Sequence, residues 1–363
     1  MANFDPVNLA VRTICPNNLV KVDDTGLPSV LVFIPKFKNS DVLNGGDDST
    51  HPAFIVNGQE IAGFYYSKYQ NCVYSGAAYS LPGENPAVLI DFDTAIDSCK
   101  AKGNGWHLGT NAEWAAIALW CKKNGFLPYG NNNSGKDSRE NNYRAILNDN
   151  NAHKTKTGTG PLTWSHDKTL SGIWDLNGNV WEWQGGVRLV WGELQIKANN
   201  DAADSNNTQG NFTGAWMAIN AADGSLVDPE SRVISSSGST SGSTVKLDYV
   251  GNVLTYSTEI TNVVNAYNNC LFSSIVCTDA IGEATKALLR ALALLPDEGA
   301  EAASYEGDCM YWNNSINELI LCRGGAYATK EKAGVFTVYF YNDRDYVGDT
   351  AGFRSAYIPE LDQ

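Results

Sequence analysis

The residues best suited to contact another molecule lie between Arg323 and Arg354, near the end of the 363-residue sequence. Five of the seventeen tyrosines fall between positions 323 and 357, among Asp, Asn, Thr, Lys and Gly. Tyrosine offers a large, rigid contact area at low entropic cost, and small polar residues add adaptable hydrogen bonds. This composition indicates a contact surface, with an ordinary tyrosine-rich hairpin as the alternative.

Small, apolar and arginine residues interrupt this polar segment and are typical of a packed frame. The three frame segments are residues 323–325, 333–336 and 352–354. The candidate ligand-binding residues between them are Ala326, Tyr327, Thr329, Lys330, Glu331, Lys332, Tyr339, Tyr341, Asn342, Asp343, Asp345, Tyr346, Asp349 and Thr350.

A strand over residues 337–341 would place Tyr339 and Tyr341 on one face, and Val338 and Phe340 on the other. We expect the tyrosines to face outward. Binding would then rest on shape, aromatic contact and a few hydrogen bonds, with no covalent bond made or broken.

Cysteine and histidine do not occur in the spacings that metal centres use. The eight cysteines include no Cys-x-x-Cys pair, and the four histidines are scattered, so a zinc site is not expected. Cys99 and Cys121 fall on the apolar faces of expected helices. We therefore predict mostly reduced thiols in the core, with a disulfide framework as the alternative.

Composition limits the class of partner. A net charge of -14 and a pI near 4.7 would repel a phosphate backbone, so a nucleic-acid partner is not expected. The first fifteen residues lack the basic and apolar regions of a secretory signal, and no stretch is long and apolar enough to span a membrane. The length fits about two domains or a single elaborated one.

Several elements that would position the candidate surface can be predicted from local patterns. Apolar runs predict strands at 28–38 and 61–69. Capping residues predict one helix from Asp91 to about Gly103 and another from Thr110 to Gly125, the second opened by a capping box with Glu113. The remaining expectations are a helical turn at 142–147, a strand at 189–196, a flexible loop or linker at 235–243 and a helix at 279–295.

Four ordered motifs resemble those of the formylglycine-generating enzyme (sulfatase-modifying factor) superfamily. Residues 105–114 resemble its R-L-P-T-E-A-E-W signature, and residues 178–183 match its G-N-V-W-E-W motif in full. The Arg-Gly-Gly at 323–325 and the Gly-Phe-Arg at 352–354 complete the set in order. The resemblance implies an α+β, C-type-lectin-like fold with small mixed sheets, two main helices and long irregular loops.

The resemblance also suggests how the chain is divided. Residues 1–27 would form an N-terminal lead-in, and residues 28–363 would form the C-type-lectin-like domain. Residues 186–315 read as an insertion, and residues 323–354 as a variable ligand-binding region.

The sequence departs from the enzymes of this superfamily where their chemistry takes place. Those enzymes carry a reactive cysteine pair shortly after the Arg-Gly-Gly motif, but residues 326–353 contain no cysteine. Cys322 precedes Arg323 and is expected in the core. The final segment instead resembles the variable region of diversity-generating retroelement target proteins, in which fixed anchors alternate with diversified positions.

A calcium site is implied by the enzyme relatives at the G-N-V-W-E-W turn. It would use the side chains of Asp175 and Glu182 and the carbonyl groups of Gly178 and Val180, since oxygen ligands suit calcium. The alternative is that the tryptophans of this turn pack in the core while Glu182 accepts hydrogen bonds. No cofactor is required by either interpretation.

These observations predict a non-enzymatic, hypervariable protein that binds a protein or glycan receptor on a cell surface. The absence of a visible signal peptide favours a virion, as part of a phage tail, over a prokaryotic cell surface. A tail location would favour a homotrimer by analogy. The alternatives are an oxygen-dependent modifying enzyme of the same fold and an adhesin of fixed specificity.

Overall fold

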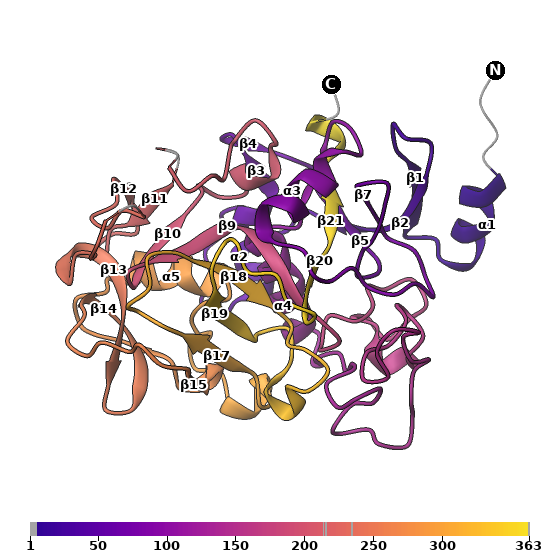
Figure 1. Ribbon diagram of the computed structural model, residues 1–363. Helices are drawn as coiled ribbons and strands as arrows, with labels where there is room; N and C mark the ends of the chain where they lie inside the picture. The colour runs from indigo at the N-terminus through magenta and orange to yellow at the C-terminus, as the bar shows by residue number, and fades with distance from the viewer. Residues whose placement is uncertain (1–5, 213, 215, 234, 362–363) are drawn as a thin grey trace.

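The computed structural model describes residues 6–212, 214, 216–233 and 235–361. Four strands from the N-terminal part of the chain and one from its C-terminal end form a five-stranded sheet. The strand order is β1-β2-β5-β21-β8, and all neighbours are antiparallel. Its strands are β1 (Asn18–Val22), β2 (Pro28–Pro35), β5 (Gly63–Ser67), β8 (Trp106–Leu108) and β21 (Ser355–Tyr357). The two predicted strands are confirmed as β2 and β5. β1 comes from the predicted lead-in and pairs with β2, while helix α1 (Pro6–Ile14) stands beside it (Figure 1).

A twelve-stranded sheet fills the centre of the molecule (Figure 1). Its main order is β15-β17-β19-β18-β9-β10-β13-β14-β16, with β11 on β10, β12 on β11 and β20 on β9. The strands are β9 (Trp181–Val190), β10 (Glu193–Ile196), β11 (Met217–Ile219), β12 (Leu226–Val227), β13 (Ser241–Val250), β14 (Val253–Glu259), β15 (Asn268–Leu271), β16 (Val276–Cys277), β17 (Cys309–Trp312), β18 (Leu319–Arg323), β19 (Val338–Asn342) and β20 (Ala351–Phe353). Strands from residues 186–315 thus share one sheet with β18 and β19.

The helices are few. Besides α1, they are α2 (Asn39–Val42), α3 (Phe92–Lys100), α4 (Asn111–Lys123) and α5 (Glu283–Ala291). Two small hairpins comprise β3 (Ile55–Val56) with β4 (Gln59–Glu60) and β6 (Cys72–Tyr74) with β7 (Ala77–Tyr79). Single 3₁₀ turns cover Pro52–Phe54, Leu162–Trp164, Asp201–Ala203, Phe272–Ser274, Ala302–Tyr305, Lys330–Lys332 and Pro359–Leu361. None of the helices in the described ranges has the length and hydropathy to cross a bilayer.

The two capped helices are confirmed. Asp91 accepts a hydrogen bond from the backbone N–H of Thr94 at the start of α3. At the start of α4, Thr110 and Glu113 form both hydrogen bonds of the capping box. Local side-chain chemistry therefore fixes where these helices begin.

Four other expectations differ from the structure. Residues 189–196 are not one strand: β9 and β10 form a hairpin, because Trp191 and Gly192 take φ values of +51° and +82° and reverse the chain. No helical turn forms at 142–147, where the chain runs irregularly to a β-bridge at Leu147. The expected loop at 235–243 ends inside β13, and α5 is shorter than 279–295 because Ala293 takes a φ of +49°.

Two apolar clusters lie on opposite faces of β19. Val338 and Phe340 belong to the larger cluster, which includes Trp114 of α4. Tyr339 packs against the second cluster, which includes Trp181 of β9 and Phe92 of α3.

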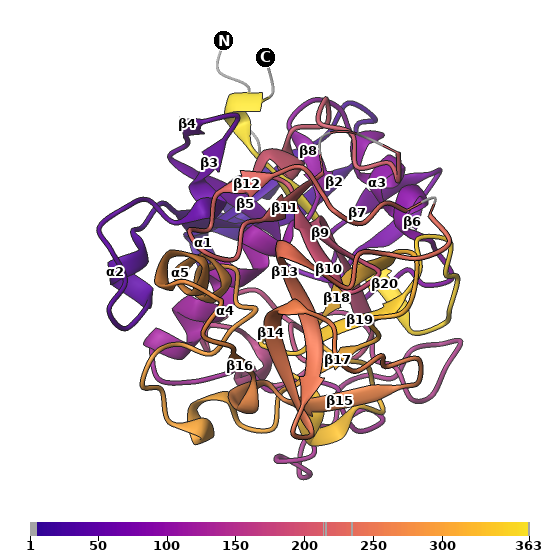
Figure 2. The same ribbon diagram turned by 90° about the vertical axis from the view of Figure 1, so that its left-hand side faces the viewer.

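Viewed from the side, the outer strands β13 and β14 lie in front of β17 and β19 (Figure 2).

Candidate ligand-binding site

The frame of the site is built around Arg323, which is fully buried at the end of β18. Its guanidinium donates hydrogen bonds to Asn111 Oδ1 at 2.7 and 3.0 Å, and to the carbonyl oxygens of Leu292 and Ala293 at 3.1 and 3.0 Å. The first residue of α4 and the end of α5 are thereby tied to β18. Because these acceptors are buried, Arg323 positions structure and is closed to a ligand.

Glycines follow Arg323 because the chain turns sharply within a packed region. Gly324 and Gly325 take φ values of +89° and +90°, which residues with a Cβ rarely adopt. A Cβ on Gly325 would lie 2.5 Å from the Cβ of Ala333. The first two frame segments therefore touch each other, which holds the intervening residues 326–332 as a closed loop.

Arg354 anchors the other end of the site. It is fully buried and donates to Glu182 Oε2 and Oε1 at 2.8 and 3.1 Å. It also donates to the carbonyl oxygens of Trp174 and Lys68 at 2.6 and 3.1 Å. Because Arg354 and Glu182 are both buried, their ion pair fixes the position of the Gly-Phe-Arg segment relative to the G-N-V-W-E-W turn.

The exposed face of β19 carries the predicted tyrosines. Val338 and Phe340 are buried on one face, while Tyr339 and Tyr341 are half-buried on the other, so the predicted alternation is confirmed. The face is not bare. The ring of Tyr339 lies 4.5 Å from Trp181 and 5.9 Å from Tyr341. Tyr339 is therefore partly a packing residue.

Two further tyrosines extend this face. Tyr311 of β17 pairs directly with Tyr339 in the parallel register, at a ring distance of 5.6 Å. Tyr267 lies 5.4 Å from Tyr311 and 5.0 Å from Tyr341, and it is 55% exposed. Tyr311 itself is only 4% exposed and packs against Tyr267 and Tyr339, so we call Tyr267, Tyr339 and Tyr341 the tyrosine surface.

Sequence reasoning missed Tyr267 and Tyr311, which come from the expected insertion. For Tyr311 a weak signal exists in the apolar run of residues 309–312, which reads as a strand. Nothing in the sequence indicates that this strand pairs in parallel with β19. The insertion thus supplies Tyr267 to the tyrosine surface and the buried ring of Tyr311 that packs against it.

The remaining candidate residues lie around the tyrosine surface in two loops. The ring of Tyr327 stacks on that of His153 at a centroid distance of 5.6 Å, and Thr329 precedes the 3₁₀ turn of Lys330–Lys332. Asp343, Asp345, Tyr346 and Asp349 are exposed and Thr350 is half-buried, all between β19 and β20. These residues are accessible to a partner.

Two candidate residues are wrong. Ala326 and Asn342 are each only 5% exposed. Ala326 belongs to the apolar cluster around Trp181, and the side chain of Asn342 points to Cys322 Sγ at 3.9 Å. The register between β18 and β19 shifts before Asn342, which pairs with Ile320 and contacts Cys322, so packing against β18 buries it.

An unpredicted anchor stands within the second loop. Arg344 is 6% exposed and donates to both carboxylate oxygens of Glu318 at 3.0 Å. It also donates to Asp93 at the start of α3 at 2.6 Å. The exposed residues on either side of Arg344 are consequently held on a fixed backbone.

Most of the thiols are buried. All eight cysteines are free, and six are buried, which confirms the expectation of reduced core thiols. Burial raises the pKa of the Cys309 thiol to about 12 and that of Cys322 well above its usual value. A thiolate nucleophile is therefore disfavoured at both positions nearest the frame.

The predicted calcium ligands come together in part. The carbonyl oxygens of Gly178 and Val180 and Glu182 Oε1 point to one place, but that place holds the side-chain amide of Gln70. Asp175 contributes its carbonyl oxygen rather than its carboxylate, which accepts from the N–H of Gly158. Across the described ranges, no three His, Cys, Asp or Glu side chains gather as metal ligands would.

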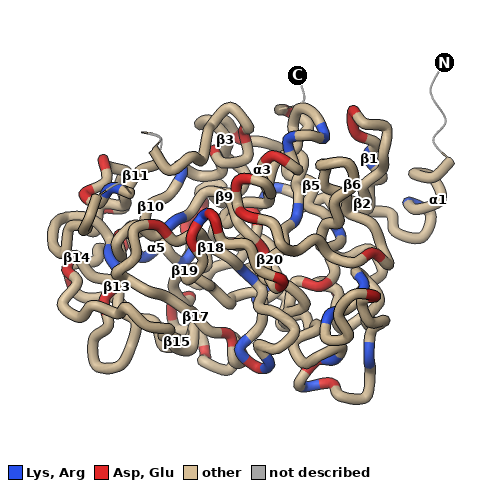
Figure 3. Tube along the Cα trace, viewed as in Figure 1, with Lys and Arg blue, Asp and Glu red and all other residues tan. Residues whose placement is uncertain are grey.

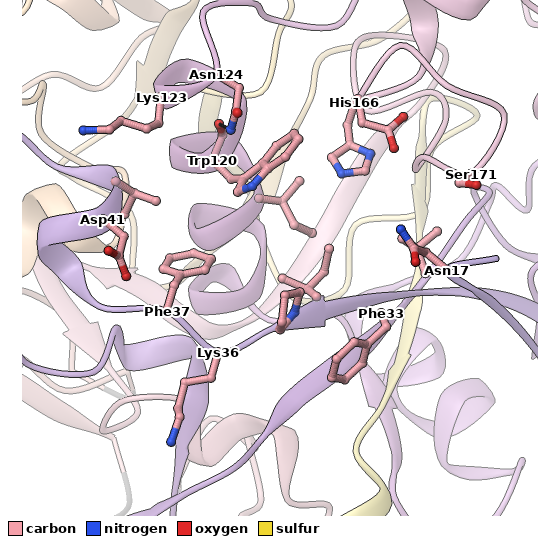
Figure 4. Close-up of a pocket in the computed structure, with 16 residues that line it drawn as sticks. Asn17, Phe33, Lys36, Phe37, Asp41, Trp120, Lys123, Asn124, His166 and Ser171 are labelled. Atoms are coloured by element: carbon pink, nitrogen blue, oxygen red, sulfur yellow. Dashed lines mark hydrogen bonds between the residues drawn. The ribbon is translucent and has the colours of Figure 1, made fainter. Parts of the chain in front are cut away.

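A separate pocket of about 510 Å³ opens between β2, α2 and α4 (Figure 4). Trp120, Phe37 and His166 point into it, while Lys36 and Lys123 point away. Burial lowers the pKa of His166 to about 4, so its imidazole is neutral at pH 7. The pocket shares no residue with the tyrosine surface.

Charge does not single out one face of the molecule. Acidic and basic residues are interspersed along the chain in the view of Figure 3. The loop after β19 nevertheless carries three exposed carboxylates, those of Asp343, Asp345 and Asp349. A ligand at this rim would meet negative charge beside aromatic rings.

A buried frame that presents exposed aromatic and polar loops on mixed sheets defines a C-type-lectin-like scaffold. Residues 47–218, a little under half of the chain, match the family model described as sulfatase-modifying factor enzyme 1-like domain. Residues 47–218 are therefore similar to this family, and the predicted α+β, C-type-lectin-like fold is confirmed.

Similar solved structures include PvdO from Pseudomonas aeruginosa, at 14% identity and a TM-score of 0.34 over 91% of this chain and 95% of that one. The Major Tropism Determinant M1 and I1 variants match at 9% and 10% identity, with TM-scores of 0.33 and 0.32, over 94% of this chain and 71% of theirs. At these TM-scores the similarity to the solved structures is distant. The comparison with curated proteins found no match.

Proposed function

We propose that this chain is a non-enzymatic protein that binds a protein or glycan receptor on a cell surface through the tyrosine surface and the loops around it. The observation that carries the proposal is the gathering of Tyr267, Tyr339 and Tyr341 on one face of the central sheet, where Tyr267 and Tyr339 also pack against the buried ring of Tyr311. Their rings offer contact area, and their hydroxyl groups offer hydrogen bonds at low entropic cost.

The frame supports binding without induced rearrangement. Arg323, Arg344 and Arg354 are each buried and donate hydrogen bonds to partners on other elements. The exposed residues between them therefore sit on a backbone that is held before a ligand arrives. Such preorganisation lowers the entropic cost of binding.

The site does not support the cysteine-based catalysis of the sulfatase-modifying enzymes. Residues 326–353 contain no cysteine, and the nearest thiol, Cys322, is buried with a raised pKa. Recognition by shape, aromatic contact and hydrogen bonding accounts for all the residues that the frame exposes.

We further propose that the exposed positions within residues 326–350 are diversified, as in the variable proteins that the segment resembles. The segment contains two kinds of position. The frame residues are buried and pack against one another, whereas the exposed residues make few packing contacts. Substitution at an exposed position therefore has little effect on the fold. The protein would be carried on a phage tail, as a homotrimer, or on a prokaryotic cell surface.

Sequencing the end of the gene in many copies from one population tests this proposal. We expect substitutions at Tyr327, Tyr341, Asp343, Asp345 and other exposed candidates, and none in the frame segments. The buried positions 326 and 342 serve as internal controls, since they lie in the same segment and should stay constant. A uniform spread of substitutions over the gene would refute diversification and favour an adhesin of fixed specificity.

A further inference from the structure

The side-chain amide of Gln70 lies inside a cage of oxygen atoms. Its Nε2 atom is 3.0 Å from Glu182 Oε1 and 3.2, 3.3 and 3.4 Å from the carbonyl oxygens of Val180, Asp175 and Gly178. Gln70 is 1% exposed and follows β5 in the chain, whereas all four oxygens belong to the loop and strand at 175–182. One amide thus holds a turn that is more than a hundred residues away in sequence.

The orientation of this amide is fixed by a chain of hydrogen bonds that starts at a backbone donor. The N–H of Thr155 donates to Asn179 Oδ1 at 2.8 Å, and a backbone N–H cannot act as an acceptor. The Nδ2 atom of Asn179 therefore faces Gln70 and donates to its Oε1 at 2.8 Å. The nitrogen of Gln70, and not its oxygen, must point into the cage.

The cage has more acceptors than the amide can satisfy. A glutamine amide carries two N–H donors, but four oxygen atoms converge on this nitrogen. A surplus of oxygens around one point is the arrangement that a hard cation such as calcium uses. The donor set is therefore that of a cation site.

The distances and charges nevertheless do not fit a cation in the present arrangement. Calcium binds oxygen at about 2.3–2.6 Å, which is shorter than every distance from the Gln70 nitrogen. The carboxylate of Glu182, the one charged group of the cage, is already neutralised by Arg354 at 2.8 Å. A cation would have to displace the amide and draw the oxygens inward.

We propose that the Gln70 amide takes the position of a bound cation, so that the turn at 175–182 keeps its shape without metal, and that removing the amide turns the cage into a calcium site. The amide uses hydrogen bonds where a cation would use coordination. The role of Gln70 is structural, and it does not depend on the function proposed for the tyrosine surface.

Thermal unfolding of the full chain in EDTA and in millimolar calcium chloride tests this proposal. The variants are Gln70→Ala, which opens space in the cage, and Gln70→Met, which fills a similar volume but has no donor. Wild type should unfold at the same temperature in both solutions. Both variants should lose roughly 5 °C in EDTA, because buried oxygens lose their donor.

Calcium distinguishes the two variants. It should restore at least half of the loss in Gln70→Ala and none of the loss in Gln70→Met. If Gln70→Ala does not fold in EDTA, refolding with and without calcium gives the same comparison. A calcium-dependent unfolding temperature for wild type would overturn the proposal, as would a failure of calcium to stabilise Gln70→Ala or a Gln70→Ala variant as stable as wild type in EDTA.

Discussion

Replacing Asp308 with Asn should make the protein more stable, and increasingly so as the pH rises. Asp308 is 2% exposed, and its Oδ2 atom accepts a hydrogen bond from the N–H of Phe336 at 2.7 Å. Gly334 packs so closely that a Cβ there would lie 2.0 Å from Asp308 Oδ1. Burial raises the pKa of Asp308 to about 7 despite that hydrogen bond.

The sign and size of the effect follow from this pKa. Between an unfolded pKa of 3.8 and a folded pKa of about 7, the folded state binds the extra proton, so stability falls as the pH rises. Each pH unit in this window is worth about 1.4 kcal/mol. The ionised carboxylate thus costs on the order of 4 kcal/mol above pH 7, and little below the unfolded pKa of 3.8. Asparagine keeps an oxygen acceptor for Phe336 without the charge.

Urea unfolding at pH 5 and pH 8 measures the difference. The gain in unfolding free energy of Asp308→Asn over wild type should be larger at pH 8 by about 2–3 kcal/mol. Comparing the two proteins at each pH cancels the contributions of other groups, such as Asp175, whose pKa burial raises to about 6. The exposed Asp279, replaced by Asn, is the matched control. Parallel pH profiles for wild type and Asp308→Asn would refute the reasoning.

Two further outcomes follow from the frame and from the tyrosine surface. Arg354→Leu should lower the unfolding free energy by about 3–5 kcal/mol in urea, because it leaves the buried carboxylate of Glu182 unpaired, and adding Glu182→Gln should recover part of the loss. Tyr339→Ala should cost about 2 kcal/mol because its ring packs on Trp181 at 4.5 Å. Tyr341→Ala should reduce adsorption to receptor-bearing cells at nearly unchanged stability, and equal stability losses in the two tyrosine variants would contradict this division of roles.

Elements that are determined by residues close together in the sequence could be predicted from local patterns. The capping box of Thr110 and Glu113 fixes the start of α4 within four residues, and alternation of side chains fixes the two faces of β19. A register shift interrupts this alternation before Asn342, and the side chain of Asn342 lies against Cys322 of β18. Its burial therefore depends on a strand pairing that the sequence does not show.

Contacts between distant segments could not be read from the sequence. Tyr267 joins Tyr341 only because β15 and β17 add to the edge of the sheet beside β19. Gln70 meets Glu182 across 112 positions, and no local pattern marks it. Trp191 takes a positive φ, a conformation that sequence patterns assign to Gly or Asn. The turn between β9 and β10 was therefore not predicted.

The position of β19 inside the sheet limits how the segment around it can change over generations. Tyr339 pairs with Tyr311 of β17 on one side and with Cys322 of β18 on the other. Adding or removing one residue in the strand would exchange its two faces and bury the tyrosines. The fold therefore tolerates replacement of the accessible side chain of Tyr341 better than an insertion or a deletion within β19.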